Sequence, residues 1–251
     1  MRYAVLSDIH GNGEALTAVL DRLATERIDR YVCLGDTIGY GADPIACLER
    51  LQRCQAMMVA GNHELGCVGT LSLQWFNEAA RAAVVWTREQ LSVTDLDSLR
   101  QLPLTATEDR FTLVHAMLRH PERFEYLVDT AHAIETMAIC PTLMCLTGHT
   151  HAPLFIEYDA PSRRVLRVVT DARELADVSW DDTPLQRRYL VNPGSVGQPR
   201  DGDPRASYAV IDTQRRTMSV HRMTYDVAAA QRKIRAANLP AFFADRLALG
   251  R

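Results

Sequence analysis

The stretch "YAVLSDIHGN" (residues 3–12) decides the fold class, because a short apolar strand runs directly into a cluster of polar side chains. The segment 13–27 that follows predicts a helix, since its leucine and valine side chains recur at helical spacing. The chain then repeats the pattern, with a strand at 30–34, a helix at 43–54 that has Asp43 as N-cap, and a strand at 55–60. This alternation predicts an α/β protein with parallel strands and right-handed crossovers.

The remainder of the chain predicts a helical insertion followed by a second set of strands. Residues 72–101 read as helical with a break near Ser92, before a strand at 111–115 resumes the sheet. Further expected elements are a helix near 129–138, a strand at 142–146, short strands between 154 and 223, and helices near 226–237 and 240–248. We expect the strands of 154–223 to form a second, largely antiparallel sheet. Because no long linker divides the chain, we expect one domain over residues 1–251, with helices on the outer faces of two packed sheets.

Length, composition and charge restrict the class of protein. With 251 residues and a hydrophobic fraction of 47%, the chain is long enough to bury a sizeable core. Its formal net charge of −3 gives no electrostatic case for binding nucleic acid or an anionic membrane. The segment 1–10 reads as neither a signal peptide nor a membrane span, because Asp8 and His10 interrupt its apolar run. We therefore expect a cytoplasmic protein without a membrane partner. The six cysteines form no CxxC pair and are expected to be reduced core residues.

Polar side chains follow five of the expected strands at the point where each strand ends. In an open α/β sheet the carboxyl ends of parallel strands share one edge, where ligands bind. Glycines beside these residues are expected to let the backbone turn sharply. The five strand ends should therefore bring together Asp8, His10, Asp36, Asn62, His63, His115, His149 and His151.

These side chains suit the binding of metal ions. Residues at i and i+2 of an extended chain point to the same side, so Asp8 with His10, and His149 with His151, should each clamp an ion. Imidazole and carboxylate without thiolate favour Mn, Fe or Zn over a structural zinc site. Eight groups exceed the needs of one ion, so two divalent ions sharing a carboxylate fit better, and Asp36 is the natural bridge.

A single motif of this kind is weak evidence for a metal site, and only the motifs taken together support that interpretation. One histidine at a strand end is more often a hydrogen-bonded structural residue, but five of the eight histidines fall at successive strand ends. His132, His221 and His120 are expected to be surface or core residues, although His120 follows His115 closely and has contact with the rim of the site as its alternative. Glu64 has two readings: it orients an imidazole, or it lies on a helix surface.

The motifs together resemble the calcineurin-like metallophosphoesterases. They are "SDIHGN" (7–12), "GDTIGYG" (35–41), "GNHE" (61–64), "VH" (114–115) and "GHTH" (148–151), in this order and at about this spacing. The later segment "NPGSVGQPRDGDPRASYAVID" (192–212) is similar to the bacterial branch of small phosphodiesterases and phosphatases. The resemblance covers nearly the whole chain, and it implies a four-layer α/β/β/α sandwich of two mixed sheets flanked by helices.

The resemblance also implies a role for each residue. One metal ion would be held by Asp8, His10, Asp36 and His151, and the second by Asp36, Asn62, His115 and His149. His63 would contact the phosphate, cationic or at least as a donor, and protonate or stabilise the leaving oxygen. The implied activity is hydrolysis of phosphodiester or phosphomonoester bonds of a small phosphate ester by a hydroxide that bridges the two ions.

Some residues depart from the family or point to its substrate. Many relatives follow the fourth-motif histidine with Gly-Ser-Pro, but here residues 116–118 are Ala-Met-Leu, which changes the wall beside the ligand. The protein phosphatases of the superfamily carry an arginine soon after Gly-Asp, and here none occurs before Arg50, which argues against that activity. We expect substrate contacts from Asn12, Tyr40 and Arg200, although a surface arginine in a plain turn explains Arg200 equally well.

Other functions of the same fold are kept as alternatives. Hydrolysis of dinucleoside polyphosphates would use aromatic rings that stack on a base, for which Tyr40, Trp75, Phe76 and Trp86 are candidates. A nuclease should show a basic groove, whereas the arginines here are scattered. A protein-binding scaffold of this fold would have lost metal ligands, and all of them are present. The insertion at 72–101 is expected to cap the metal edge, and the sequence is compatible with a homo-oligomer.

Overall fold

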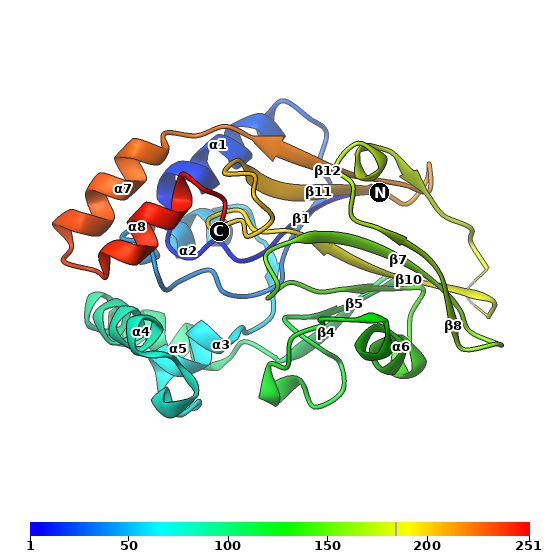
Figure 1. The fold of residues 1–251 in the computed structure, drawn as a ribbon, viewed down its shortest axis with the longest axis horizontal. Coiled ribbons are helices and arrows are strands. Elements are labelled where there is room, and N and C mark those ends of the chain that lie inside the picture. Colours follow the sequence, from blue (N-terminus) through cyan, green and yellow to red (C-terminus); the bar gives the residue numbers. More distant parts are fainter. Residues whose placement is uncertain (184) are drawn as a thin grey trace.

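Two six-stranded sheets pack face to face in the computed structural model, which describes residues 1–183 and 185–251 (Figure 1). The strand order of the first sheet is β3 (Met57–Met58), β2 (Arg30–Cys33), β1 (Arg2–Leu6), β11 (Ala206–Asp212), β12 (Thr217–Met223) and β9 (Val178–Ser179). The order of the second sheet is β4 (Thr105–Glu108), β5 (Phe111–Val114), β6 (Met144–Leu146), β10 (Arg187–Pro193), β7 (Pro153–Asp159) and β8 (Arg164–Val169).

Both sheets are mixed: the first has its parallel strands at one side, whereas the second has them in the middle, with antiparallel strands at both edges. Strands β1, β2 and β3 are parallel in the first sheet, as are β5, β6 and β10 in the second. The expectation that residues 154–223 form a sheet of their own is wrong. Strands β7, β8 and β10 extend the second sheet, whereas β9, β11 and β12 extend the first. The physical reason is that β2 pairs with only one edge of β1, and β11 satisfies the backbone groups of the other edge.

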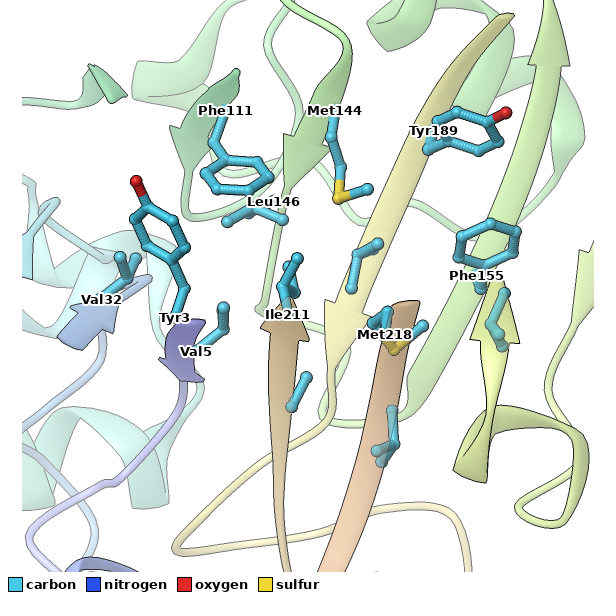
Figure 2. Close-up of a cluster of buried hydrophobic side chains, with 14 of the residues drawn as sticks. Tyr3, Val5, Val32, Phe111, Met144, Leu146, Phe155, Tyr189, Ile211 and Met218 are labelled. Carbon is cyan, nitrogen blue, oxygen red and sulfur yellow. The ribbon is translucent and has the colours of Figure 1, made fainter. Parts of the chain in front are cut away.

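The core between the sheets follows from the alternation of side chains along each strand. Tyr3 and Val5 of β1 point toward the second sheet, where the ring of Tyr3 lies edge-on to Phe111 with centroids 4.9 Å apart. Figure 2 shows this layer, in which Met144 and Leu146 face the strands of the first sheet. Ala4 and Leu6, the alternate residues of β1, belong to a different cluster on the outer face.

Helices cover the outer faces of both sheets. The outer face of the first sheet packs against α1 (Gly13–Ala24) and α2 (Pro44–Arg53), whose apolar side chains share a cluster with that face. The outer face of the second sheet packs against α6 (Thr130–Ile139). The predicted four-layer α/β/β/α sandwich is therefore confirmed. Among the described residues, every helix is too short or too polar to cross a lipid bilayer.

The remaining helices gather at one end of the sandwich (Figure 1). They are α3 (Asn62–Val68), α4 (Glu78–Gln90), α5 (Val93–Arg100), α7 (Val227–Ala236) and α8 (Ala241–Leu247). The predicted break lies at Ser92, which caps α5 by accepting a hydrogen bond from the backbone of Asp95. Helices α4 and α5 pack on α3, and α4 also contacts α7 and α8. Short 3-10 helices, η1 (Leu73–Trp75), η2 (Pro121–Arg123) and η3 (Glu174–Ala176), lie in the connections.

Candidate metal centre

The polar strand ends converge, but they come from two sheets instead of one. Asp8 and His10 follow β1, Asp36 follows β2, and Asn62 and His63 begin α3 after β3, all in the first sheet. The second sheet contributes His115, directly after β5, and the pair His149 and His151 after β6. We expected all five strand ends in one sheet, and this was wrong. The sequence of a strand and of the residues after it does not specify which sheet the strand joins. The parallel strands of both sheets end at the same place, so the side chains still meet.

The aspartate and histidine side chains form overlapping groups that could each hold a metal ion. Asp8, His10 and His151 lie together, and so do Asp36, His115 and His149, with ligand atoms of each group within 4.8 Å of one another. A third overlapping group contains His63 with His10 and Asp36. One carboxylate oxygen, Asp36 Oδ2, lies 3.7 Å from His10 Nε2 and 3.3 Å from His115 Nε2. Asp36 therefore stands between the two groups.

The ring orientations leave nitrogen lone pairs facing one another. Nδ1 of His10 lies 3.3 Å from the Ile38 carbonyl oxygen, and Nδ1 of His151 lies 2.6 Å from that of Gln198. A carbonyl oxygen only accepts, so both Nδ1 atoms donate, and Nε2 of each neutral ring carries a lone pair. These two Nε2 atoms are only 3.1 Å apart. Burial lowers the pKa of both imidazoles, so protonation does not relieve this repulsion. A metal cation between them would.

The second group has the same need for positive charge. Nδ1 of His115 donates to the Leu34 carbonyl oxygen at 2.7 Å, and its Nε2 lies 3.1 Å from His149 Nδ1. Burial lowers the pKa of His115, but the Asp36 carboxylate raises it more, to about 9. Burial lowers the pKa of His149 to about 3. The pKa of His115 thus favours a positive charge between the Asp36 carboxylate and the His149 ring, which is the charge that a metal cation would supply.

Each carboxylate has one oxygen bound by protein and one directed at the cluster. Asp8 Oδ2 accepts from Ser7 Oγ and the His149 backbone N–H, whereas its buried Oδ1 has no hydrogen-bond partner. Asp36 Oδ1 accepts from the His63 backbone N–H, which leaves Oδ2 between the two groups. The buried Asn62 Oδ1 also lacks a partner. Orphaned buried oxygens are costly unless a cation satisfies them, so the donor set fits divalent metal ions.

The backbone, not an extended i, i+2 repeat, aims these ligands. The expected extended geometry is wrong, because five ligands have a left-handed backbone with φ between 49° and 65°: Asp8, His10, Asp36, His149 and His151. Such conformations are uncommon outside glycine and cost about 1–3 kcal/mol each, so the surrounding structure must hold them. Backbone hydrogen bonds between the first two loops do so, from Asp8 N to Gly35 O and from His10 N to Asp36 O.

Glycines beside the ligands turn the chain at some positions and make room at others. Gly35 has the expected positive φ of 95°. A Cβ on Gly61, in contrast, would lie 2.1 Å from Asp36 Oδ1, and a Cβ on Gly148 would lie 2.0 Å from Ser7 Oγ. The absence of a side chain at these two positions lets the loops of different strands approach each other closely.

Glu64 holds two of the ligand-bearing loops through hydrogen bonds to their backbone. Its fully buried carboxylate accepts four backbone N–H groups, those of Gly61, Asp36, Thr37 and Ile38, at 2.7–3.3 Å. Neither of the two roles considered from the sequence describes this one. Burial and the Asp36 charge raise the pKa of Glu64 to about 7, while the backbone N–H groups oppose that rise. The glutamate at the third position of a helix, three residues after Gly61, was the available signal, because it is half of a capping box.

His63 lies beside the metal ligands in an aromatic setting. Its ring is edge-on to Tyr40, at 4.3 Å between centroids, and to Phe76, at 5.4 Å. Its buried Nδ1 has no hydrogen-bond partner. Burial lowers the pKa of His63 to about 4, so the cationic form considered from the sequence is disfavoured and a neutral donor ring remains.

The three expected substrate residues occupy different settings. Asn12 caps α1 by accepting from Ala15 N at 3.0 Å, and its Nδ2 donates to Gly197 O at 2.8 Å. The Tyr40 ring lies tilted by 33° against the ring of His10, with centroids 4.3 Å apart. Arg200 is half-buried with its Nε lacking a partner, and its positive charge helps to lower the pKa of His63 after burial and neighbouring groups. Arg200 therefore lies near the cluster, whereas the amide of Asn12 is largely occupied.

A cavity of about 250 Å³ opens beside the second group of ligands. We call it the aromatic pocket; its lining residues are Asn62, Leu71, Trp75, Phe76, Arg123, Phe124, Tyr126 and His149. Trp75 and Phe76 come from the start of the insertion, so this part of it reaches the site. Trp86, also considered for base stacking, instead packs between α4 and the helices α7 and α8. Phe124 and Tyr126 follow the Ala-Met-Leu segment, and the sequence had given no signal for them.

Comparison with known proteins agrees with this geometry. Residues 1–216 match the family described as the calcineurin-like phosphoesterase superfamily domain. The chain belongs to this superfamily. It is a metal-dependent phosphoesterase, since the superfamily uses divalent metals and the buried Asp and His groups suit them. An uncharacterized protein of Methanocaldococcus jannaschii is 35% identical over 256 residues, covering 99% of this chain and 98% of that protein.

Two solved structures of similar length share the whole fold. A metallophosphoesterase from Sphaerobacter thermophilus is 37% identical with a TM-score of 0.86, covering 100% of this chain and 99% of that one. A hypothetical protein from Pyrococcus horikoshii is 21% identical with a TM-score of 0.76, covering 100% and 98%, and it shows the fold alone. The superfamily implies a small phosphate ester as substrate of this phosphoesterase.

Proposed function

We propose that this phosphoesterase hydrolyses phosphodiester or phosphomonoester bonds of a small phosphate ester at a site that holds two divalent ions, with Mn, Fe or Zn suited to the donors. The observation that carries the proposal is the position of Asp36 Oδ2, within 3.7 Å of a ring nitrogen of each ligand group. Asp8, His10 and His151 would hold one ion, and Asn62, His115 and His149 the other, with Asp36 between them. Two such ions supply a nucleophilic water at neutral pH and stabilise negative charge on the phosphate.

The residues of the chain would orient the ester and assist its leaving group. His63, edge-on to His10 at 4.8 Å between ring centroids, is placed to donate to the leaving oxygen as the ester bond breaks. The unpaired Nε of Arg200 would donate to a phosphate oxygen, since a guanidinium matches phosphate geometry. Hydrolysis of dinucleoside polyphosphates remains the alternative, and the aromatic pocket is the observation that favours it.

A hydrolysis assay with a matched variant tests the proposal. Purified protein supplied with Mn²⁺ should hydrolyse an aryl phosphodiester or monoester, and a chelator should abolish the activity. Asp36→Ala should lower kcat/KM by more than about 10³-fold, because it removes a ligand from both ions. Asp97→Asn, an exposed carboxylate on α5, serves as the control and should keep full activity. Turnover that does not need metal, or that survives Asp36→Ala, would refute the dinuclear site.

A further inference from the structure

The aromatic pocket presents unusually exposed aromatic rings next to the metal ligands. Trp75 is 73% exposed and Tyr126 is 48% exposed, whereas Phe76 and Phe124 are each only 7% exposed. Large aromatic side chains are normally buried in the core, and an exposed group of them marks a binding surface. The pocket therefore has two buried rings, and its two other rings are exposed to solvent.

Two of the rings lie directly against imidazoles of the metal-binding cluster. Tyr126 stacks on the metal ligand His149, with centroids 4.0 Å apart and an interplanar angle of 23°. Phe124, held in a left-handed conformation with φ of 50°, lies 6.0 Å from His115. His149 belongs to both the pocket and the second ligand group, and Asn62, proposed as a further ligand of that group, also lines the pocket. A phosphate held at the cluster would therefore carry its ester group directly into this pocket.

The size and chemistry of the pocket identify what it accepts. Its volume of about 250 Å³ lies below the roughly 300–1,000 Å³ of pockets for drug-sized ligands, so it suits one ring system. The indole of Trp75 and the phenyl of Phe76 offer π-faces, while Arg123 offers a guanidinium that stacks on a ring or donates to its edge. No carboxylate lines the cavity among the described residues. Stacking faces combined with edge donors are the features that bind a nucleobase.

We propose that the aromatic pocket holds a nucleobase, so that the substrate of this phosphoesterase is a nucleoside phosphate ester. The base lies between the ring of Trp75 and the floor formed by Phe76 and Phe124, with its polar edge toward Arg123. This inference rests on the proposed function for the placement of the phosphate, but the base site itself is tested without any turnover.

Binding of a nucleoside without phosphate provides that test. Adenosine should bind the Mn²⁺-supplied protein saturably in isothermal titration calorimetry and quench tryptophan fluorescence. Trp75→Ala should weaken adenosine binding about 5- to 150-fold, the range for loss of one base–aromatic stack, and Trp75→Phe should restore most of it. Val93→Ala, which removes an exposed apolar side chain of α5 outside the pocket, should bind like the wild type.

A matched pair of phosphates then connects the base site to the catalytic cluster. AMP and ribose 5-phosphate share the same ester bond and differ only by the base, so they are compared as inhibitors of aryl ester hydrolysis. AMP should inhibit at least about fivefold more tightly in the wild type, and Trp75→Ala should remove this difference. Equal inhibition by the two compounds, or no saturable adenosine binding, overturns the proposal. Phenol binding as tightly as adenosine also overturns it, in favour of a simple aryl site. A protein that binds adenosine but hydrolyses no ester contradicts the proposed function alone.

Discussion

The metal-binding cluster and the aromatic pocket touch each other, yet they are built in opposite ways. The cluster consists of buried side chains on strained backbone, with each carboxylate and most rings fixed by hydrogen bonds to protein. The pocket consists of rings on short connecting segments; Trp75 and Tyr126 are exposed, and Tyr126 stacks on His149. The difference teaches that the groups proposed for the reaction are fixed by the fold, whereas the rings proposed to contact the substrate lie partly exposed on connecting segments. His149 belongs to both regions, so it offers the best place to separate them.

Among the variants that separate the cluster from the pocket, the largest effect should come from paired variants of the "GHTH" motif. His151→Ala should weaken the ion held with Asp8 and His10, and His149→Ala the ion held with Asn62 and His115. Each should lower kcat/KM by about 10²–10³-fold or more, because one ion no longer stabilises charge on the phosphate. His149→Ala should in addition weaken adenosine binding, since it removes the ring under Tyr126.

Metal titration and calorimetry on the two variants check this comparison. Elemental analysis should find one ion per chain in each variant, and only His149→Ala should change the affinity for adenosine. Identical effects of both variants on adenosine binding would show that the pocket and the cluster are not separable in this way.

A smaller effect should come from Glu64, which acts through the backbone of the ligand loops. Glu64→Gln replaces one acceptor oxygen with a donor, so two of the four backbone N–H groups lose their partner. We expect Mn²⁺ affinity to fall about 10–100-fold, as for other residues that orient metal ligands. Adenosine binding should stay at the wild-type level, because the pocket contains no group bound to Glu64.

The affinities are measured on folded protein, with far-UV circular dichroism recorded at the same temperature. Glu89→Gln on the exposed face of α4 is the matched control. Wild-type Mn²⁺ affinity in Glu64→Gln would mean that the loops hold their left-handed conformation without the carboxylate.

Local patterns predicted the elements and the ligand set, because both depend on short spacing. The helix at 43–54 begins at Pro44 as expected, with Asp43 in the N-cap position. The Asp43 carboxylate, however, makes no capping bond and contacts Lys233 Nζ at 2.7 Å, which a local pattern does not encode. In the same way, a strand sequence does not specify which sheet it joins, so the division of residues 154–223 between two sheets was missed.

For the candidate site, too, local motifs predicted some residues, whereas residues that act through distant contacts were missed. The expected ligands lie in motifs at strand ends, and the structure brings the aspartates and histidines among them together. Glu64 was missed as a loop-holding residue because three of its four partners, the backbone N–H groups of residues 36–38, lie far from it in sequence. The aromatic pocket was only partly foreseen, through Trp75 and Phe76, because Phe124 and Tyr126 reach it from a loop without regular periodicity.

The central claim is that two metal ions share Asp36, and anomalous scattering from crystals soaked in Mn²⁺ tests it most directly. The account predicts two peaks, one among Asp8, His10 and His151 and the other among Asn62, His115 and His149, with the Asp36 carboxylate between them. A single peak, or two peaks of which one does not touch Asp36, would contradict it.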